Sequence, residues 1–432
     1  MEKHKVKLLE LELRRKRFGN IGALDFLIKL ERDRASKQGF FNKKGVVSSA
    51  SDMKQICNAL VEHLPSLGDY LFDESRMQDF LFQSVSIAES FGDKAAAYQA
   101  KRKIGDNEYY PEINLLEANY RLTENDFEGW VSCVQNYLQR ANVAPVSLSK
   151  DKSVPLFFRL KAEPSKQIYN GEKVSVLIAA FNAEETIEFS VQSILQQSWK
   201  NLEVIIVDDA STDGTWEKIS YLAERDNRLK IIRNELNVGP YVSKNIALDI
   251  STGKFITGQD ADDWSHPERI ENQLAYLNKF NSKAGLSFML RINKEGRFNH
   301  LSKCSSFSLD GALRKSLISC IFDAEFLKGE LGYWDCVRFG ADSEFIARLE
   351  IATGEKILLM PFCSMFCLDT NSSLTNSKVF GVSKKYGLGK VRAAYQDAWK
   401  NWHKSLTQGN TKLGFNEGRK LFSVPRHARV DI

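Results

Sequence analysis

The chain has no long hydrophobic run. No stretch of its 432 residues approaches the roughly 18 consecutive apolar residues of a membrane-spanning helix. The first residues, MEKHKVKLLELELRRKR, also lack the apolar core of a secretory signal peptide, so we expect no export and a cytoplasmic protein. The formal net charge is only +5, which argues against a dedicated nucleic-acid binder. The composition is otherwise that of an ordinary globular protein.

Cysteine is scattered, and two common nucleotide-binding signatures are missing. The 7 cysteines are odd in number, and the closest pair, Cys363 and Cys367, lacks the spacing of a zinc knuckle or redox motif. We therefore expect reduced, buried thiols. No G-x-G-x-x-G follows a strand-like run and no G-x-x-x-x-G-K-[ST] occurs, which removes the main support for a dinucleotide or P-loop site.

Residues 1–145 are predicted to form an all-α domain. Apolar residues recur there at helical spacing, and only Pro65 and Pro111 interrupt the chain before Pro145. The stretch EINLLEANYRLTENDFEGWVSCVQNYLQRA contains two amphipathic segments around a polar turn at 123–126. This resembles one helical hairpin of the tetratricopeptide kind, without a clear second copy of the repeat. We expect this domain to pack or to bind a partner protein.

From residue 174 the pattern changes to short apolar runs. After an irregular linker over 146–172, runs such as VSVLIAAFN and LEVIIVDD are continuous and rich in β-branched residues, which is typical of strands covered on both faces. Such runs occur at 174–182, 202–209, 229–233, 254–258 and 284–292, and helical patterns alternate with them. The alternation predicts an α/β fold with a mostly parallel sheet flanked by helices. We place this domain at 173–375 and a helical tail at 376–432.

Acidic and amide side chains follow the ends of three predicted strands. They are Asn182, then Asp208 and Asp209, then Asp260, Asp262 and Asp263. Ligands of open α/β sheets bind beyond the carboxyl ends of the strands. Crowded carboxylates are unfavourable without a cation, and hard oxygen ligands suit Mg²⁺ or Mn²⁺.

Simpler explanations exist for each of these groups. Asn182 with Glu185 fits a helix capping box. Asp208 and Asp209 can start a turn, and Asp260 with Asp262 can form a solvated turn. Each D-x-D pair alone is a weak signal, whereas the joint arrangement over 174–270 is specific.

Two stretches resemble the nucleotide-sugar half of family 2 glycosyltransferases with the GT-A fold. They are VSVLIAAFNAEETIEFSVQSILQQSWKNLEVIIVDDASTDGT and NVGPYVSKNIALDISTGKFITGQDADDWSHPERI. The resemblance covers 173–275 closely and the acceptor half, 276–375, loosely; the helical domain lies outside it. It implies an inverting transfer from a nucleotide sugar, with Mn²⁺ or Mg²⁺ as cofactor.

The resemblance also implies roles for residues at the strand ends. Ala180 and Asn182 would contact the nucleoside, and Asp209 would recognise the uracil edge, which favours a UDP-linked donor. Asp260 and Asp262 match the D-x-D pair that holds the metal and the diphosphate. Lys244 stands where the family commonly has Arg, and it can meet a phosphate as a point charge but without the bidentate fork.

On the acceptor side, LGYWDCVRFGADSEFIARLE (331–350) resembles the segment that presents the catalytic base at the start of a helix. Asp342 matches that base, although it also suits a helix N-cap. Glu344 is the substitute candidate. Tyr333 and Trp334 form either an acceptor-sugar platform or core packing. His403 is a candidate third metal ligand or a packing residue, and Ser373 or Thr375 could touch substrate.

The function that these observations favour is metal-dependent transfer of a sugar to a hydroxyl of a glycan or lipid-linked acceptor, in bacterial surface polysaccharide (capsule or O-antigen) synthesis. The alternatives are a non-catalytic helical scaffold with a degenerate transferase domain and a sugar nucleotidyltransferase. The basic stretches at 3–17 and 384–392 favour peripheral contact with the inner face of the cell membrane, or else are solvated charged helices.

Overall fold

The computed structural model describes residues 113–139, 143–299, 301, 312–370, 382–383 and 387–430. The chain divides into two compact units, Met1–Tyr137 with Arg297–Ala312, and Leu138–Gly296 with Leu313–Ile432. The helices expected before residue 113 lie outside the described residues. Within the described ranges, no helix is both long enough and apolar enough to cross a membrane.

The described part of the first unit contains a helical hairpin. Helices α6 (Ile113–Thr123) and α7 (Phe127–Leu138) flank a short turn. Asp126 caps α7 by accepting a hydrogen bond from the backbone N–H three residues further on, at 2.8 Å. The buried Trp130 ring stacks on Phe298 with 5.9 Å between ring centroids. The two helices and their turn agree with the amphipathic pattern of the sequence.

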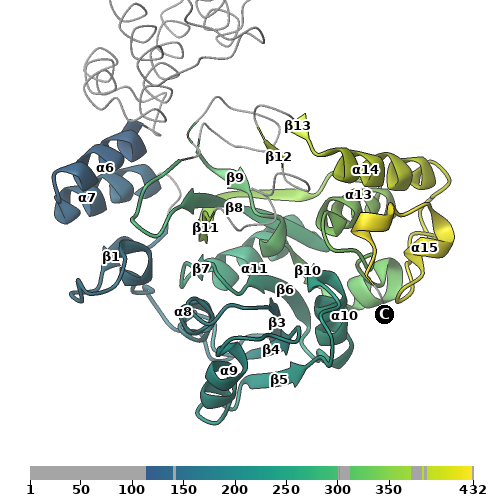
Figure 1. The fold of residues 1–432 in the computed structure, drawn as a ribbon, viewed down its shortest axis with the longest axis horizontal. Coiled ribbons are helices and arrows are strands. Elements are labelled where there is room, and N and C mark those ends of the chain that lie inside the picture. Colours follow the sequence, from purple (N-terminus) through teal and green to yellow (C-terminus); the bar gives the residue numbers. More distant parts are fainter. Residues whose placement is uncertain are drawn as a thin grey trace, which may run out of the picture. The chain divides into compact units, whose positions relative to one another are not determined.

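One nine-stranded sheet organises the second unit (Figure 1). Its first half has the strand order β5-β4-β3-β6, and all neighbours in it are parallel. The four strands are β3 (Val174–Ala180), β4 (Leu202–Asp208), β5 (Leu229–Arg233) and β6 (Phe255–Asp260). The predicted α/β fold class is therefore confirmed, and β3 lies between β4 and β6.

The second half of the sheet is mixed. Strand β10 lies antiparallel between β6 and β8, and β11 runs parallel to β8. Strands β7 and β9 pair antiparallel with β11 and β8, respectively. The bounds are β7 (Trp264–Ser265), β8 (Ala284–Ile292), β9 (Arg314–Lys315), β10 (Ile321–Asp323) and β11 (Leu358–Leu368). The purely parallel pattern thus ends at β6.

Both faces of the parallel strands are covered, which explains why their sequences are continuously apolar. Alternate residues of β3 enter different cores: Leu177 packs with α10 and α13, whereas Val176 and Ile178 pack with α8 and α11. The bounds of the described helices around the sheet are α8 (Ile187–Leu195), α9 (Thr215–Ala223), α10 (Pro240–Ile250), α11 (Arg269–Phe280), α12 (Ala324–Phe326) and α13 (Ala341–Thr353).

The cysteines of the described ranges follow the sequence expectation. Cys133, Cys320, Cys336, Cys363 and Cys367 are buried and form no disulfide. Burial raises the pKa of the Cys320 and Cys367 thiols well above the ordinary value. These thiols therefore behave as packing side chains rather than nucleophiles.

The linker and the tail belong to the second unit. The predicted linker carries a small antiparallel pair, β1 (Val146–Leu148) and β2 (Leu160–Ala162). The tail contains another pair, β12 (Val382–Ser383) and β13 (Gly387–Leu388), and helices α14 (Lys390–His403) and α15 (Gly418–Leu421). Tyr395 and Trp399 of α14 are buried in the same core as Phe345 of α13. The tail therefore forms part of the core beside α13.

Candidate functional site

The carboxyl ends of three adjacent strands bring the expected polar groups to one edge of the sheet. Ala180 of β3 is paired with Asp208 of β4, and Ala179 with Asp260 of β6. Asp208 and Asp260 thus lie on either side of the end of β3. This is the position at which open α/β sheets bind ligands.

Asp208 and Asp209 are both buried, and each has a partner within the chain. Asp208 is fully buried and forms an ion pair with Arg233 Nε at 3.1 Å. Asp209 is 2% exposed; its Oδ1 accepts hydrogen bonds from Asn234 Nδ2 at 2.8 Å and Val238 N at 2.9 Å, and its Oδ2 accepts one from Gly239 N at 2.8 Å. Asp209 therefore anchors the loop before α10. The family resemblance implied a different role for Asp209, recognition of the uracil edge, and did not predict this anchoring.

The loop after β3 also differs from the capping-box interpretation. Helix α8 begins only at Ile187, and its N-cap is Thr186. Asn182 instead adopts a positive φ of 48°, and its Oδ1 accepts a hydrogen bond from Thr212 N at 2.9 Å. A short polar side chain tolerates this left-handed backbone. Asn182 therefore ties the loop after β3 to the loop after β4.

Ala180 and Phe181 have opposite environments at the end of β3. The Ala180 side chain is 1% exposed, and its carbonyl accepts a hydrogen bond from Asp209 N at 2.8 Å. Phe181, in contrast, is 49% exposed. Phe181 directly follows the apolar run of β3, so the sequence did contain an aromatic residue at the strand end as a signal. The comparison of residue types with the family did not single it out.

Three carboxylates, Asp260, Asp262 and Asp263, form what we call the acidic edge. Asp260 has a 49% exposed side chain, and its Oδ1 lies 3.8 Å from Lys244 Nζ. Burial and the neighbouring charge of Asp260 raise the pKa of Asp262 to about 6. Asp263 is buried and accepts a hydrogen bond from Leu368 N at 2.9 Å. Asp263 thus holds β11, and Asp260 and Asp262 are left as the candidates for a ligand.

A divalent cation fits the chemistry of Asp260 and Asp262. Burial first, and then the charge of Asp260, raise the pKa of Asp262, and a bound cation would offset both effects by favouring the ionised carboxylate. Nowhere in the described ranges do three or more His, Cys, Asp or Glu side chains gather in a way that could hold a metal ion. The remaining ligands would therefore have to come from a substrate or from water, as is common for Mg²⁺.

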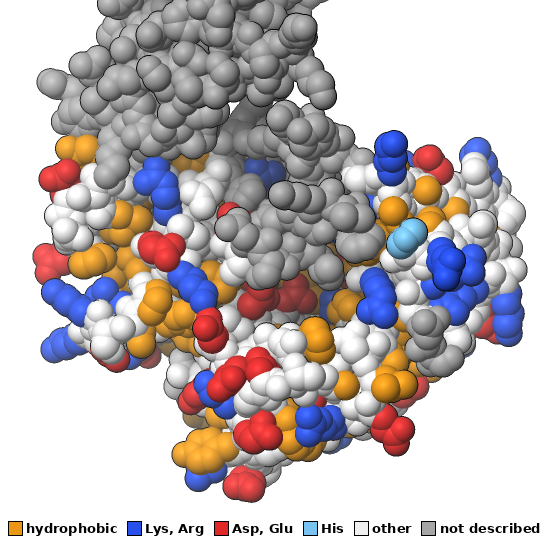
Figure 2. Space-filling model, in the orientation of Figure 1, with side chains coloured by type: hydrophobic (Ala, Val, Ile, Leu, Met, Phe, Trp, Pro, Cys, Tyr) orange, Lys and Arg blue, Asp and Glu red, His pale blue; other side chains and the backbone are white. Residues whose placement is uncertain are grey.

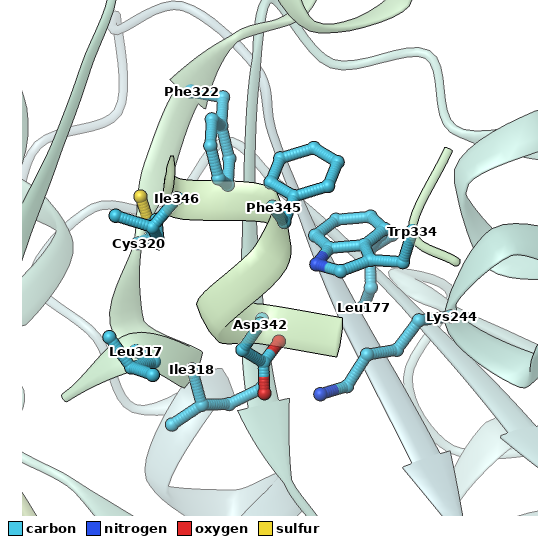
Figure 3. A pocket seen from close by; sticks show the side chains of 11 residues that line it. Leu177, Lys244, Leu317, Ile318, Cys320, Phe322, Trp334, Asp342, Phe345 and Ile346 are labelled. Carbon is cyan, nitrogen blue, oxygen red and sulfur yellow. The ribbon is translucent and has the colours of Figure 1, made fainter. Parts of the chain in front are cut away.

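Lys244 connects the acidic edge to a pocket between α10 and α13. This α10–α13 pocket is lined by Lys244, Asp342, Trp334 and Phe345, together with apolar residues from the segment before β10. Figure 3 shows the Lys244 ammonium and the Asp342 carboxylate pointing into the same space, with the aromatic rings beside them. Burial alone would lower the pKa of Lys244, but the carboxylates of Asp342 and Asp260 outweigh it, and the pKa is raised. Lys244 is therefore a buried cation between two acidic groups.

Asp342 lies in the first turn of α13 rather than at its cap. The cap position belongs to Gly340, which has a φ of 86°. Asp342 Oδ2 accepts a hydrogen bond from the Tyr241 hydroxyl at 2.9 Å. The side chain is consequently directed at α10, in the donor half of the domain, instead of back at its own backbone.

Glu344 and His403 pair with each other. His403 Nε2 lies 2.9 Å from Glu344 Oε1, and Arg348 Nε donates to the same oxygen at 2.7 Å. Burial opposes ionisation of Glu344, but Arg348 and His403 outweigh it, so the pKa of Glu344 is lowered. His403, the candidate third metal ligand, therefore has Glu344 as its partner, and Glu344, the candidate substitute base, is paired with both Arg348 and His403.

Tyr333 and Trp334 separate into different surroundings. The Tyr333 hydroxyl donates to Asp249 Oδ1, and its ring meets Phe415 edge-on at 5.2 Å. Trp334 is 8% exposed and stacks on Phe345 with 4.5 Å between centroids. Only Trp334 of the two lines the α10–α13 pocket. Ser373 and Thr375 lie outside the described residues.

Helix α10 supplies contacts that the sequence analysis missed. Asn245 Nδ2 donates to Trp334 O at 2.8 Å, and Trp334 N donates to Asn245 Oδ1 at 3.0 Å. Tyr241, Lys244 and Asn245 lie three and four residues apart, which places them on one side of the helix. The sequence contained a signal for these contacts, because polar residues recur at this spacing on a helix that packs against a sheet.

Open α/β sheets bind ligands beyond the carboxyl ends of their parallel strands, and this sheet carries charged groups at that edge. Residues 175–327 match the family described as glycosyl transferase family 2. The chain therefore carries a family 2 glycosyltransferase domain.

Three curated relatives support this assignment. The putative glycosyltransferase EpsE of Bacillus subtilis is 46% identical over 111 residues, which cover 26% of this chain and 40% of that protein. The Escherichia coli protein WfaP, named a UDP-Glc:α-D-GlcNAc-diphosphoundecaprenol β-1,3-glucosyltransferase, is 41% identical over 106 residues (24% and 41%). The putative teichuronic acid biosynthesis glycosyltransferase TuaG of B. subtilis is 34% identical over 152 residues (34% and 60%). The matched segments thus span 40–60% of the length of these relatives.

Proposed function

We propose that the chain is an inverting glycosyltransferase, which moves a sugar from a nucleoside-diphosphate sugar to a hydroxyl of a glycan or lipid-linked acceptor. The observation that carries the proposal is the α10–α13 pocket, in which Asp342 faces Lys244 while Lys244 contacts Asp260 of the acidic edge. The proposed general base and the proposed diphosphate-binding edge would therefore lie next to each other. This is the arrangement that displacement at an anomeric carbon requires.

Asp342 would take the proton from the acceptor hydroxyl as that oxygen attacks the anomeric carbon. The bond between this carbon and the diphosphate oxygen breaks on the opposite side, so one displacement inverts the configuration. General-base assistance of this kind is typically worth about 10²–10⁴-fold in rate. Lys244, a buried cation beside the acidic edge, would stabilise negative charge on the departing diphosphate.

Asp260 and Asp262 would hold Mn²⁺ or Mg²⁺ together with the donor diphosphate. When bound, the cation supplies Lewis-acid stabilisation of the leaving group. Phe181 is exposed at the end of β3, and its ring would stack on the base of the nucleotide. Asn182 and Asp209 would act indirectly, because their side chains hold the loops that flank this position.

The acceptor is proposed from chemistry and from the names of relatives. WfaP is named for transfer from UDP-Glc to a diphosphoundecaprenol-linked GlcNAc, and TuaG for teichuronic acid biosynthesis. We propose a UDP-linked donor, a polyprenyl-diphosphate-linked acceptor and a role in surface polysaccharide synthesis. Trp334 lines the α10–α13 pocket, and the acceptor sugar would lie at the mouth of that pocket.

Such an acceptor would bring the protein to an anionic membrane surface. Figure 2 shows Lys and Arg side chains gathered over the region of α14 and α15. The exposed basic residues of these two helices include Lys390, Lys400, Arg419 and Lys420. Basic residues near such a surface are each worth about 1 kcal/mol of attraction. We therefore extend the proposed peripheral contact from the predicted basic stretches to this C-terminal face.

A donor screen tests the proposed function. The full chain is incubated with Mn²⁺ and UDP-, GDP- or dTDP-sugars, with or without GlcNAc-diphosphoprenol, and the released nucleotide is identified. We expect release of a nucleoside diphosphate from one donor, faster with the acceptor and abolished by EDTA. Release of pyrophosphate would instead indicate a nucleotidyltransferase. Donor binding without turnover would indicate a scaffold with a degenerate transferase domain.

A further inference from the structure

A tyrosine of the donor half makes direct contact with the proposed base. Tyr241 lies in the first turn of α10, is 7% exposed, and donates its hydroxyl hydrogen to Asp342 Oδ2 at 2.9 Å. The two residues are 101 positions apart in the chain. Burial, followed by the nearby charge of Asp342, raises the pKa of Tyr241 well above its ordinary value. The phenol therefore stays protonated and remains a hydrogen-bond donor.

The position of Tyr241 is set by the loop that precedes it. Gly239 caps α10 with a φ of 85°, a conformation that favours glycine, and its N–H is held by Asp209 Oδ2 at 2.8 Å. The ring of Tyr241 belongs to the core that also contains Phe345 of α13. Asp209 thus anchors the start of α10, and α10 in turn places the Tyr241 hydroxyl at Asp342.

Three other titratable groups lie near this pair, one on α10 itself and two on other elements. Lys244 lies one turn further along α10. Burial alone would lower its pKa, but the charges of Asp342 and Asp260 outweigh burial, so the pKa of Lys244 is raised. Arg392 of α14 interacts electrostatically with Tyr241 and Asp342. Cys320, just before β10, is buried beside Asp342, and burial followed by that charge raises the pKa of its thiol. Among these neighbours, Tyr241 is the neutral donor that directly contacts Asp342.

We propose that Tyr241 is a positioning residue for the transfer reaction: by occupying Oδ2 of Asp342, its hydroxyl fixes the carboxylate so that Oδ1 is presented to the acceptor hydroxyl. In the transfer step, the acceptor proton passes to Asp342, the acceptor oxygen bonds to the anomeric carbon, and the diphosphate leaves with the electron pair of the broken bond. The inference rests on the proposed function, and it adds a residue that lies outside the D-x-D pair and the base itself.

Tyr241→Phe is the direct test, because it removes one oxygen atom and keeps the buried ring. A hydrogen bond to a charged group is worth enough for its loss to lower kcat by about 10- to 100-fold. A donated hydrogen bond favours the ionised carboxylate, so the acid limb of the pH profile of kcat/KM should move to higher pH in the variant. The dissociation constant for the donor with Mn²⁺ should change less than about twofold, because Tyr241 does not touch the acidic edge.

The matched control is Tyr169→Phe, which removes an exposed hydroxyl that donates to Gln167 Oε1 at 2.7 Å. This control should keep the kcat and the pH profile of the wild type. Thermal unfolding of both variants separates lost positioning from lost folding, since a purely structural role lowers Tm without moving the acid limb. A Tyr241→Phe enzyme with wild-type kcat and an unmoved acid limb would overturn the inference. Failure of the wild type to release nucleoside diphosphate would contradict the proposed function instead.

Discussion

In the proposed function, Asp262 is the side chain on which metal-dependent donor binding most depends. Asp262 lies two residues after Asp260 in the chain. Burial, and then the negative charge of Asp260, raise the pKa of Asp262 to about 6. A bound divalent cation would reverse this balance, because it favours the ionised form of both carboxylates. Asp263, by contrast, has its buried carboxylate committed to Leu368 N. The three adjacent acids therefore have different tasks.

Asp262→Ala should remove metal-dependent nucleotide binding. Calorimetric titration of the nucleoside diphosphate in Mn²⁺ should show at least about a tenfold weaker affinity, since a carboxylate ligand to the cation is lost. In EDTA the variant and the wild type should bind equally weakly. Asp151→Asn, at an exposed position in the segment between β1 and β2, is the control and should bind like the wild type. Unchanged affinity of Asp262→Ala in Mn²⁺ would remove this residue from the site.

Single residues also show how far the sequence reaches. Residue types at the strand ends indicated Asp260 as a candidate and the family resemblance indicated Asp342, and in the structure Lys244 lies beside both carboxylates. They were insufficient for His403, because nothing local indicates that its partner is Glu344, 59 residues away. The same limit applies to Asp209, whose three hydrogen-bond donors lie 25, 29 and 30 residues further along the chain. Long-range partners decide these roles, and the periodicity of the sequence does not encode them.

At the scale of elements, α13 is held from its buried side by an ion pair. Arg348 and Glu344 have no exposed side-chain surface, and Arg348 also donates to the carbonyls of Thr411 and Tyr333 at 3.1 and 2.8 Å. Three segments therefore meet at one guanidinium: the helix of Asp342, the loop of Trp334 and the C-terminal tail. These contacts hold the first turn of α13 in place beside the α10–α13 pocket.

Glu344→Gln should destabilise the chain strongly at neutral pH. Breaking a buried ion pair typically costs about 3–5 kcal/mol, since it leaves the partner charge uncompensated. Glu350→Gln, on the same helix, breaks the exposed pair with Lys356 Nζ and should cost about 0–1 kcal/mol. Urea unfolding of both variants measures the difference. Equal stabilities would contradict the structural role given to Glu344.

The same ion pair predicts a pH dependence of stability. The pKa of Glu344 is lowered in the folded chain, so its stabilising contribution is complete above its ordinary value of 4.5 and is lost as the pH falls below that value. The free energy of unfolding of the wild type should therefore approach that of Glu344→Gln as the solution is acidified from pH 6 to about pH 3. A difference that stays constant over this range would mean that Glu344 does not titrate as the structure indicates.

The strands were more predictable than the helix starts. The predicted strands at 229–233 and 284–292 coincide with β5 and β8, because short β-branched runs bounded by polar turns have few alternatives. Helix α8 begins later than the capping-box pattern at Asn182 indicated, since Asn182 bonds to Thr212 in another loop. Caps depend on which tertiary partner captures the polar side chain, so they are the harder feature to predict.

At the scale of the whole molecule, the tail is part of the second unit although the family match ends at residue 327. Tyr395 donates to Asp335 Oδ2 at 2.9 Å, and Val337 is paired with Arg429 of the tail. Burial, then the charge of Glu344, raises the pKa of Asp335 to about 6, which Tyr395 partly offsets. The surroundings of the proposed base are thus completed by residues beyond the recognisable family domain.

The central claim is that Asp342 and the acidic edge act together as one active site. The most direct measurement compares wild type and Asp342→Asn for donor affinity and for released nucleoside diphosphate, with the donor identified in the screen and GlcNAc-diphosphoprenol as acceptor. The account predicts donor affinity within about twofold and transfer reduced by about 10²–10⁴-fold, because only the general base is lost. Turnover within about tenfold of the wild type would contradict it.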